Sequence, residues 1–253
     1  MDFKKSISNW QKSGIGIVHK HNIRPLYPAM KDLGNLNFTI PDNLLCIAGH
    51  NYEKTLFEEQ MEFHGQSTHD YTVVHFNKEK TTPWSHFMRW KKTVSCMKES
   101  SREYVLFMDP TDTLFIDSPH NILNNFLIKF NCEVLFNSTQ YRRGYRWDKH
   151  SESSIKYHHS KARRLLRGAP PRLSKHLNGG VFIGRRDFVV KLYEDVLSYE
   201  LDSSGQRDES SWEKHPEFPY GCADDQKTLR HLEYKYYPEL QIDGKNTLFI
   251  RCN

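Results

Sequence analysis

The residues from 104 to 112 constrain the fold of this chain more than any other stretch. Four consecutive apolar residues, Val105 to Met108, end at Asp109, and a second acid, Asp112, follows three positions later. A continuous apolar run is typical of a strand buried on both faces, as in a parallel sheet. Pro110 lacks a backbone N–H and favours a turn, so both carboxylates should lie just beyond the carboxyl end of this strand.

This position is chemically informative because open α/β sheets bind their ligands beyond the carboxyl ends of the strands. Paired carboxylate oxygens suit Mg²⁺ or Mn²⁺, especially when a diphosphate supplies further oxygen ligands. Aspartate and proline are also common in turns that bind nothing. The stretch alone therefore leaves two alternatives, a metal site at Asp109 and Asp112 or an ordinary turn.

The first half of the chain alternates between strand patterns and helix patterns. Short apolar runs predict strands at 44–48, 70–77, 104–109 and 133–138. Apolar residues spaced three or four apart predict amphipathic helices at 53–64, 84–97 and 119–130, the last with Ser118 as its cap. Such alternation favours parallel strands joined by right-handed crossovers. We therefore predict an α/β fold with a mixed, mostly parallel, Rossmann-like sheet flanked by helices.

Two later motifs have both a structural and a functional interpretation. Asn178-Gly179-Gly180 precedes an apolar run at 181–183. Its glycines either allow a ligand to approach the backbone closely or form an ordinary turn before a strand. Asp224-Asp225-Gln226 begins a predicted helix, where acids either stabilise the helix N-terminus or orient a polyhydroxyl ligand. The closing segment, 240–250, predicts one or two strands around a turn at 243–245.

The flanking and inserted segments are harder to interpret. We expect residues 1–43 to form an N-terminal extension that packs on a single domain at 44–253 or partly frays. Within this extension, His19 and His21 form either a metal-binding pair or, as is commoner, structural or solvated side chains. The segment at about 141–175 has eleven Lys and Arg residues against two acids. It is interpreted as an inserted basic loop near the acceptor, and nucleic-acid binding is disfavoured because no nucleic-acid motif accompanies it.

The composition excludes several classes of protein. A chain of 253 residues fits one larger α/β domain. It contains no run of about 20 apolar residues that could span a bilayer, and its start lacks the apolar core of a signal peptide. Five scattered cysteines argue against a disulfide framework or a zinc knuckle. We expect a cytoplasmic protein, whose net charge of +5 is compatible with an anionic ligand such as a nucleotide.

The order of the three motifs resembles that of metal-dependent glycosyltransferases of the GT-A fold. It is most similar to the glycosyltransferase domain of procollagen lysyl hydroxylases and its stand-alone relatives. In that family a strand ends in Asp-x-x-Asp, followed by Leu-Asn-Ser-Gly-Gly-Phe-Ile-Gly and later by an aspartate run with Gln. The corresponding residues here lie at 107–112, 177–184 and 224–226, and 89–92 resembles the basic-aromatic part of the preceding helix. The resemblance covers about residues 44–253.

This resemblance implies a UDP-sugar donor and a hydroxyl acceptor, such as a hydroxylysine-like side chain, a glycan or a small molecule. It implies a retaining hexosyltransferase in which Asp109 and Asp112 bind Mn²⁺ or Mg²⁺. It also places Asp224 and Asp225 near the transferred sugar and the acceptor. The residues implied to contact the donor are Gly49, His50, Asn51, Arg89, Thr111, Asn178, Gly179 and Gly180.

The sequence departs from the family at two positions. Thr111 stands where the family has a tyrosine that stacks on uracil, and no histidine follows the last strand to act as a third metal ligand. Either two carboxylates and the diphosphate hold the metal, or the chain is truncated, or activity is reduced. Three other classes stay open: a GT-A domain that binds nucleotide or carbohydrate without turnover, a basic nucleic-acid-binding protein, and a nucleotidyltransferase. The last is disfavoured, since no glycine-rich triphosphate loop lies near the first strand.

Overall fold

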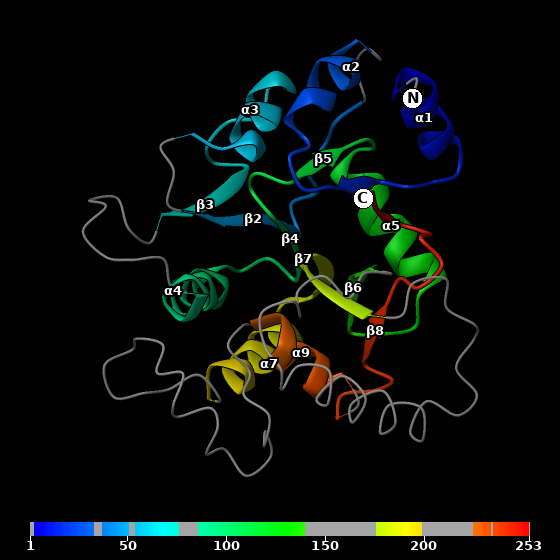
Figure 1. The fold of residues 1–253 in the computed structure, drawn as a ribbon. Helices are drawn as coiled ribbons and strands as arrows, with labels where there is room; N and C mark the ends of the chain where they lie inside the picture. The colour runs from blue at the N-terminus through cyan, green and yellow to red at the C-terminus, as the bar shows by residue number, and fades with distance from the viewer. Residues whose placement is uncertain are drawn as a thin grey trace.

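A six-stranded sheet forms the centre of the computed structural model, which describes residues 3–32, 37–50, 54–75, 86–139, 176–198, 225–233 and 235–252 (Figure 1). Its strands in spatial order are β3 (Tyr71–His75), β2 (Leu44–His50), β4 (Tyr104–Met108), β7 (His176–Arg185), β6 (Val134–Thr139) and β8 (Leu240–Ile242). Strand β7 is antiparallel to both of its neighbours, and the other three pairings are parallel. The predicted mixed, mostly parallel sheet is confirmed.

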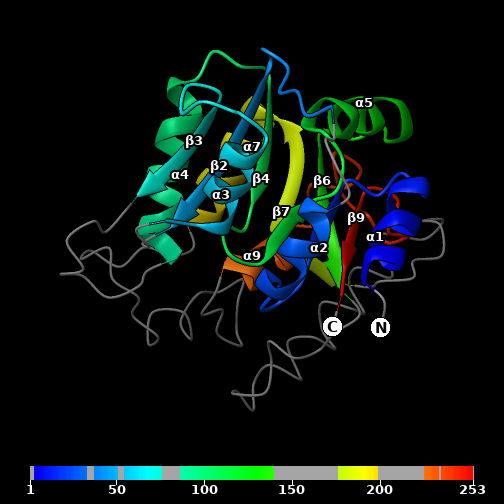
Figure 2. The ribbon, with the colours of Figure 1, turned by 90° about the horizontal axis from the view of Figure 1, so that it is seen from above.

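Helices cover both faces of this sheet, as the two perpendicular views show (Figures 1 and 2). Alternate residues of β4 point to opposite faces, as expected for a strand. Val105 and Phe107 pack with α4 (His86–Glu99), α7 (Arg186–Ser198) and α9 (Asp225–Leu232). Leu106 and Met108 pack with α3 (Leu56–Phe63) and α5 (Pro119–Lys129). Both cores therefore use the apolar run at 105–108.

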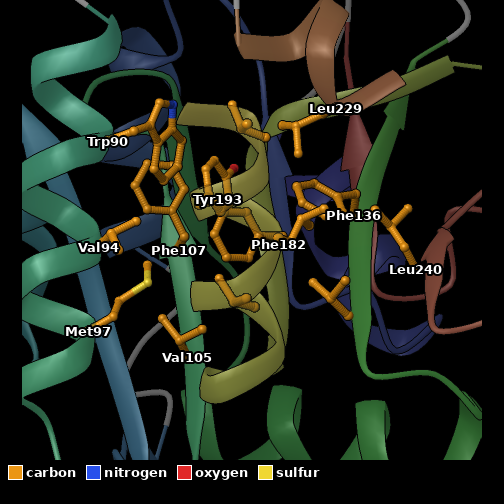
Figure 3. Packing of buried hydrophobic residues seen from close by; sticks show 14 of the residues in the cluster. Trp90, Val94, Met97, Val105, Phe107, Phe136, Phe182, Tyr193, Leu229 and Leu240 are labelled. Carbon is orange, nitrogen blue, oxygen red and sulfur yellow. The ribbon is translucent and has the colours of Figure 1, made fainter. Parts of the chain in front are cut away.

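Aromatic side chains fill the first of these cores (Figure 3). The rings of Trp90 and Tyr193 stack with their centroids 3.8 Å apart and so join α4 to α7. Phe107 and Phe182 stack at 5.1 Å and join β4 to β7. Each such pair stabilises the fold by about 0.5–1.5 kcal/mol beyond the burial of its apolar area. This packing makes the sheet a rigid support for the loops at its edge.

A second, three-stranded sheet contains a strand that the sequence did not predict. Strand β1 (Ile17–His19) lies between β5 (Thr113–Phe115), to which it is antiparallel, and β9 (Phe249–Arg251), to which it is parallel. The short helices α1 (Phe3–Lys12), η1 (Arg24–Leu26) and α2 (Tyr27–Lys31) surround it and share an apolar cluster. Residues 17–19 thus form the middle strand of a sheet.

Local signals explain where the helices begin. Thr55 and Glu58 form a reciprocal capping box at the start of α3. Ser118 accepts a hydrogen bond from the Asn121 N–H at 3.3 Å, and Pro119 is the first residue of α5. The predicted start of this helix is confirmed. Among the described residues no helix has the length and apolar character needed to cross a membrane. The basic segment at 141–175 lies outside the described residues.

Candidate functional site

The two acids of the opening stretch directly follow β4, at the predicted edge of the sheet. Asp109 Oδ1 accepts hydrogen bonds from the Thr111 backbone N–H and hydroxyl, both at 3.1 Å, and from the Asp112 N–H at 3.3 Å. The Asp109 N–H donates to the Gly180 carbonyl at 2.6 Å. These bonds fix the Asp109 carboxylate and tie its loop to β7. Thr111, expected near the nucleotide, holds the first acid instead of presenting an aromatic ring.

The electrostatic surroundings shift the pKa values of the two carboxyl groups in opposite directions. Burial acts to raise the pKa of Asp109, but the Arg89 guanidinium, His19 and the hydrogen bonds from Thr111 outweigh it, so the pKa is lowered. The pKa of Asp112 is raised by burial and by the negative charge of Asp109, against an opposing contact with His21. Asp109 is therefore the acid that stays ionised more readily. Asp112 is the acid whose negative charge a bound cation would stabilise.

The segment after β1 lies directly against Asp112. The Lys20 N–H donates to the Asp112 carbonyl at 2.8 Å, and the Asn22 N–H donates to Asp112 Oδ1 at 3.3 Å. His21 Nδ1 lies 3.4 Å from Asp112 Oδ2. Asn22 has a φ of 56°, a left-handed conformation that asparagine tolerates in turns. From the sequence, His19 and His21 were one possible metal-binding pair with no connection to the acids.

His19 lies inside the fold, with 4% of its surface exposed. Burial and the nearby Arg251 charge lower its pKa to about 4, although Asp109 acts in the opposite direction, so the imidazole is neutral at pH 7. Its ring lies on Gly180: a Cβ atom at that position would be 2.3 Å from His19 Cε1. The space beside Gly180 that a side chain would need is therefore filled by the ring of another residue.

The Asn178-Gly179-Gly180 motif lies within β7, so its interpretation as a turn before the strand is wrong. The strand continues through both glycines, and its register against β6 shifts at this point, between Phe136 and Asn137. Gln226 in the first turn of α9 accepts hydrogen bonds from Asn178 Nδ2 at 3.0 Å and from the Gly179 N–H at 3.2 Å. Two of the three sequence motifs are thus joined directly.

The carboxyl end of β2 lies beside the same acids. Gly49 faces α4, where an added Cβ would be 3.3 Å from Arg89 Cγ. Burial lowers the pKa of His50 to about 4, although the Asp109 charge acts in the opposite direction. The Arg89 guanidinium lies 5.1 Å from the Phe107 ring centroid, a cation–π distance. Arg89 thereby brings a buried positive charge close to Asp109.

Arg251 is a site residue that the sequence analysis missed. Its strand, β9, pairs with β1 so that Arg251 lies opposite His19. Its guanidinium interacts electrostatically with both Asp112 and Asp109. No local motif marks this residue, because only the pairing of two distant strands brings it to the acids. Together with Arg89 it places two positive charges around two carboxylates.

Most of the predicted site residues converge at this edge of the sheet. The structure brings together Gly49, His50, Arg89, Asp109, Thr111, Asp112, Asn178, Gly179 and Gly180. Asn51 and Asp224 lie outside the described residues, and Asp225 is described only as the first residue of α9. Within the described ranges, no group of three or more His, Cys, Asp or Glu side chains is arranged to hold a metal ion.

Comparisons with known proteins find similar solved structures. No protein-family model matches the chain, and no curated protein matches its sequence. The fold is similar to the crystal structure of mouse xyloside xylosyltransferase 1 in its apo form, with a TM-score of 0.44 and 9% sequence identity. The match covers 89% of this chain and 82% of the mouse protein. A similarity of this degree does not transfer an activity from one protein to the other.

Proposed function

We propose that this chain is a metal-dependent GT-A glycosyltransferase that moves a hexose from a UDP-sugar to a hydroxyl acceptor. One observation carries the proposal: three motifs that are far apart in the sequence are hydrogen-bonded together at one edge of the sheet. The Asp109 N–H donates to Gly180, and Asn178 donates to Gln226 in the helix that Asp225 begins. An ordinary turn at Asp109 would not require these two partners.

Asp109 and Asp112 are the residues that would hold Mn²⁺ or Mg²⁺, which would neutralise the negative charge developing on the departing diphosphate. Their carboxylates are hard oxygen donors of the type that these ions prefer. Burial and the negative charge of Asp109 raise the pKa of Asp112, and an added cation would reduce the repulsion between the two carboxylates. Since the described residues contain no group of three protein ligands, diphosphate oxygens and water would complete the coordination.

The other residues have roles on either side of this ion. Gly49, His50 and Arg89 would lie along the nucleotide and its diphosphate, because they surround Asp109 at the end of β2. Asn178 would lie near the donor sugar. Asp224 and Asp225 would orient the sugar and the acceptor, and a retaining outcome is part of the proposal without an assigned nucleophile. The acceptor is proposed to be a hydroxyl group on a side chain, glycan or small molecule.

A nucleotide-release assay with a panel of UDP-hexoses, with and without Mn²⁺, tests this proposal. We expect UDP release that requires the metal and that falls at least about 100-fold in Asp112→Ala, as is common when a charge-stabilising group is removed. Asp42→Ala is the matched control, since Asp42 is exposed and lies just before the opposite end of β2. Metal-independent release, or equal rates in the two variants, would contradict the proposed role of Asp112.

A second function, nucleotide binding without turnover, is favoured by Arg251. This residue brings a permanent positive charge to both acids, and the described residues contain no third metal ligand. Under this alternative, UDP binds without Mn²⁺, and no UDP-hexose is consumed. Titration calorimetry with UDP in the presence of EDTA, run beside the release assay, separates the two functions.

A further inference from the structure

A buried glutamine joins helix α3 to the strand that follows the acid pair. Gln60 lies within α3, and 0% of its surface is exposed. Its Nε2 group donates hydrogen bonds to the Thr113 carbonyl at 3.0 Å and to the Leu56 carbonyl at 3.1 Å. Its Oε1 atom accepts a hydrogen bond from the Phe115 N–H at 2.7 Å. Gln60 thus holds both ends of β5.

The orientation of the Gln60 amide follows from these three partners. Nε2 faces two carbonyl oxygens and Oε1 faces an N–H, so exchanging its ends would set donor against donor and acceptor against acceptor. Among the described strands β5 is the outer one of its sheet, so one of its sides faces no other strand. The Gln60 amide takes the place of a neighbouring peptide on that side, because it accepts one N–H of β5 and donates to one carbonyl.

Two further contacts extend this anchoring from β5 to the acids. The Thr113 hydroxyl donates a hydrogen bond to the Asp109 carbonyl and closes the loop between β4 and β5. At the start of α3, the Phe57 N–H donates to the Pro110 carbonyl at 3.0 Å. Asp112 lies inside this closed loop, directly before Thr113. The position of Asp112 relative to Asp109 therefore depends on where α3 holds β5.

The same helix also contacts the segment on the other side of Asp112. Arg24 donates two hydrogen bonds to the Glu59 carboxylate, at 2.9 and 3.2 Å. The Asn22 N–H, two residues before Arg24, donates to Asp112 Oδ1 at 3.3 Å. The Arg24 side chain is 58% exposed, and ion pairs with such exposure contribute little to stability. The loss of Gln60 should therefore move Asp112 more than the loss of this ion pair.

We propose that Gln60 is a positioning residue for the acid pair. It fixes β5 against α3 and thereby holds the Asp112 carboxylate in place beside Asp109. The consequence for metal binding rests on the proposed function, in which these two acids hold Mn²⁺ or Mg²⁺. Since its own side chain is completely buried, Gln60 acts through the strand and not by contact with a ligand.

Mn²⁺ binding in two matched variants tests the proposal. Gln60→Met nearly keeps the length of the side chain but removes its hydrogen bonds. Gln66→Met is the control, since Gln66 Nε2 also donates to two carbonyls, those of Phe38 and His64, just beyond the other end of α3. We expect the Mn²⁺ dissociation constant, measured by EPR without nucleotide, to rise about 10-fold in Gln60→Met and less than about twofold in Gln66→Met. Equal constants in the two variants would overturn the proposal.

A second pair of variants tests the same connection if Gln60→Met does not fold. Thr113→Val replaces the hydroxyl that bonds to the Asp109 carbonyl with a methyl group, whereas Thr113→Ser keeps a hydroxyl at this position. The Mn²⁺ dissociation constant should rise about 10-fold in the valine variant and stay within about threefold of wild type in the serine variant. A valine variant that binds Mn²⁺ as tightly as wild type would refute the dependence of the acid pair on β5.

A third measurement needs neither metal nor turnover. In NMR spectra of the metal-free protein, the backbone amide resonances of Phe115 and Asp112 should shift in Gln60→Met and stay near their wild-type positions in Gln66→Met. A shift at Phe115 without one at Asp112 would show that Gln60 holds the strand but does not position the acid, and would refute the proposal. If wild-type protein binds no Mn²⁺ but both resonances shift, the metal-dependent function fails and the positioning of Asp112 stands.

Discussion

Gly180 provides a sharp test of how this site is packed. In Gly180→Ala the new methyl group would lie 2.3 Å from His19 Cε1 and 3.0 Å from Nε2, well inside van der Waals contact. Forcing an extra methyl into a packed interior costs about 1–3 kcal/mol. If the ring moves away instead, the buried polar groups that face it lose a partner, at about 1–3 kcal/mol each. Because ring movement relieves part of the overlap, we expect a total loss of about 2–4 kcal/mol.

The adjacent glycine is the matched control. At Gly179 an added Cβ would be 3.4 Å from Leu229 Cδ1, an ordinary contact, so Gly179→Ala should change stability by less than about 1 kcal/mol. Urea unfolding followed by the fluorescence of buried Trp90 measures both changes at equal protein concentration.

A double-mutant cycle identifies the responsible side chain. In a His19→Ala background the ring is absent, so Gly180→Ala should cost less than about 1 kcal/mol, giving a coupling of about 2 kcal/mol or more. If Gly180→Ala is as stable as Gly179→Ala, or if its cost is the same with and without the His19 ring, the packing of Gly180 against His19 is refuted.

Two further predictions concern buried ionisable groups. His19 and His50 each have a pKa lowered to about 4, so the unfolded chain takes up protons near pH 6.5 that the folded protein refuses until about pH 4. This contribution to the free energy of unfolding should be fully present above pH 6.5 and should fall as the pH drops towards 4, by at most about 3 kcal/mol for each histidine. Urea midpoints across this range measure the fall, which should be smaller in His19→Gln. A flat profile would contradict the prediction. Asp243 is buried, and its carboxylate accepts the backbone N–H groups of Thr247, Leu248 and Phe249 at 2.6–2.8 Å. Asp243→Asn should lower the unfolding free energy by about 2–3 kcal/mol, because the amide replaces one acceptor oxygen with a donor. The control Asp42→Asn should change it little. Equal thermal midpoints in these two variants would exclude an anchoring role for Asp243.

The predictable part of the fold is the part with sustained periodicity. Strands β2 and β4 and helices α3 and α5 lie where apolar runs and capping residues placed them, because their patterns extend over several residues. Strands β1 and β5 were not predicted, since three residues carry no period that can be distinguished from a loop. The start of β7 was misjudged because glycines usually weaken strands. Here the register of β7 against β6 shifts at the glycines, and the His19 ring takes the space beside Gly180.

The site shows the same division between local and distant information. Asp109 and Asp112 were identified from their own neighbours, because a strand followed by a turn is a local signal. His19, His21 and Arg251 reach these acids only through β1, which pairs with two strands distant in the sequence. A histidine in an unpaired extension and an arginine near residue 250 have no individual signature. Their contribution depends on tertiary pairing, which one sequence does not specify.

The pairing of β1 with β9 has a consequence for the order of assembly. Residues 17–19 find their parallel partner in residues 249–251, which lie far away in the sequence. Contacts of such large sequence separation form late and slowly, because the intervening chain must first be ordered. The strands of the central sheet that lie earlier in the chain can therefore pair ahead of the acid pair's surroundings. The chain would complete its binding edge only in a late step of folding.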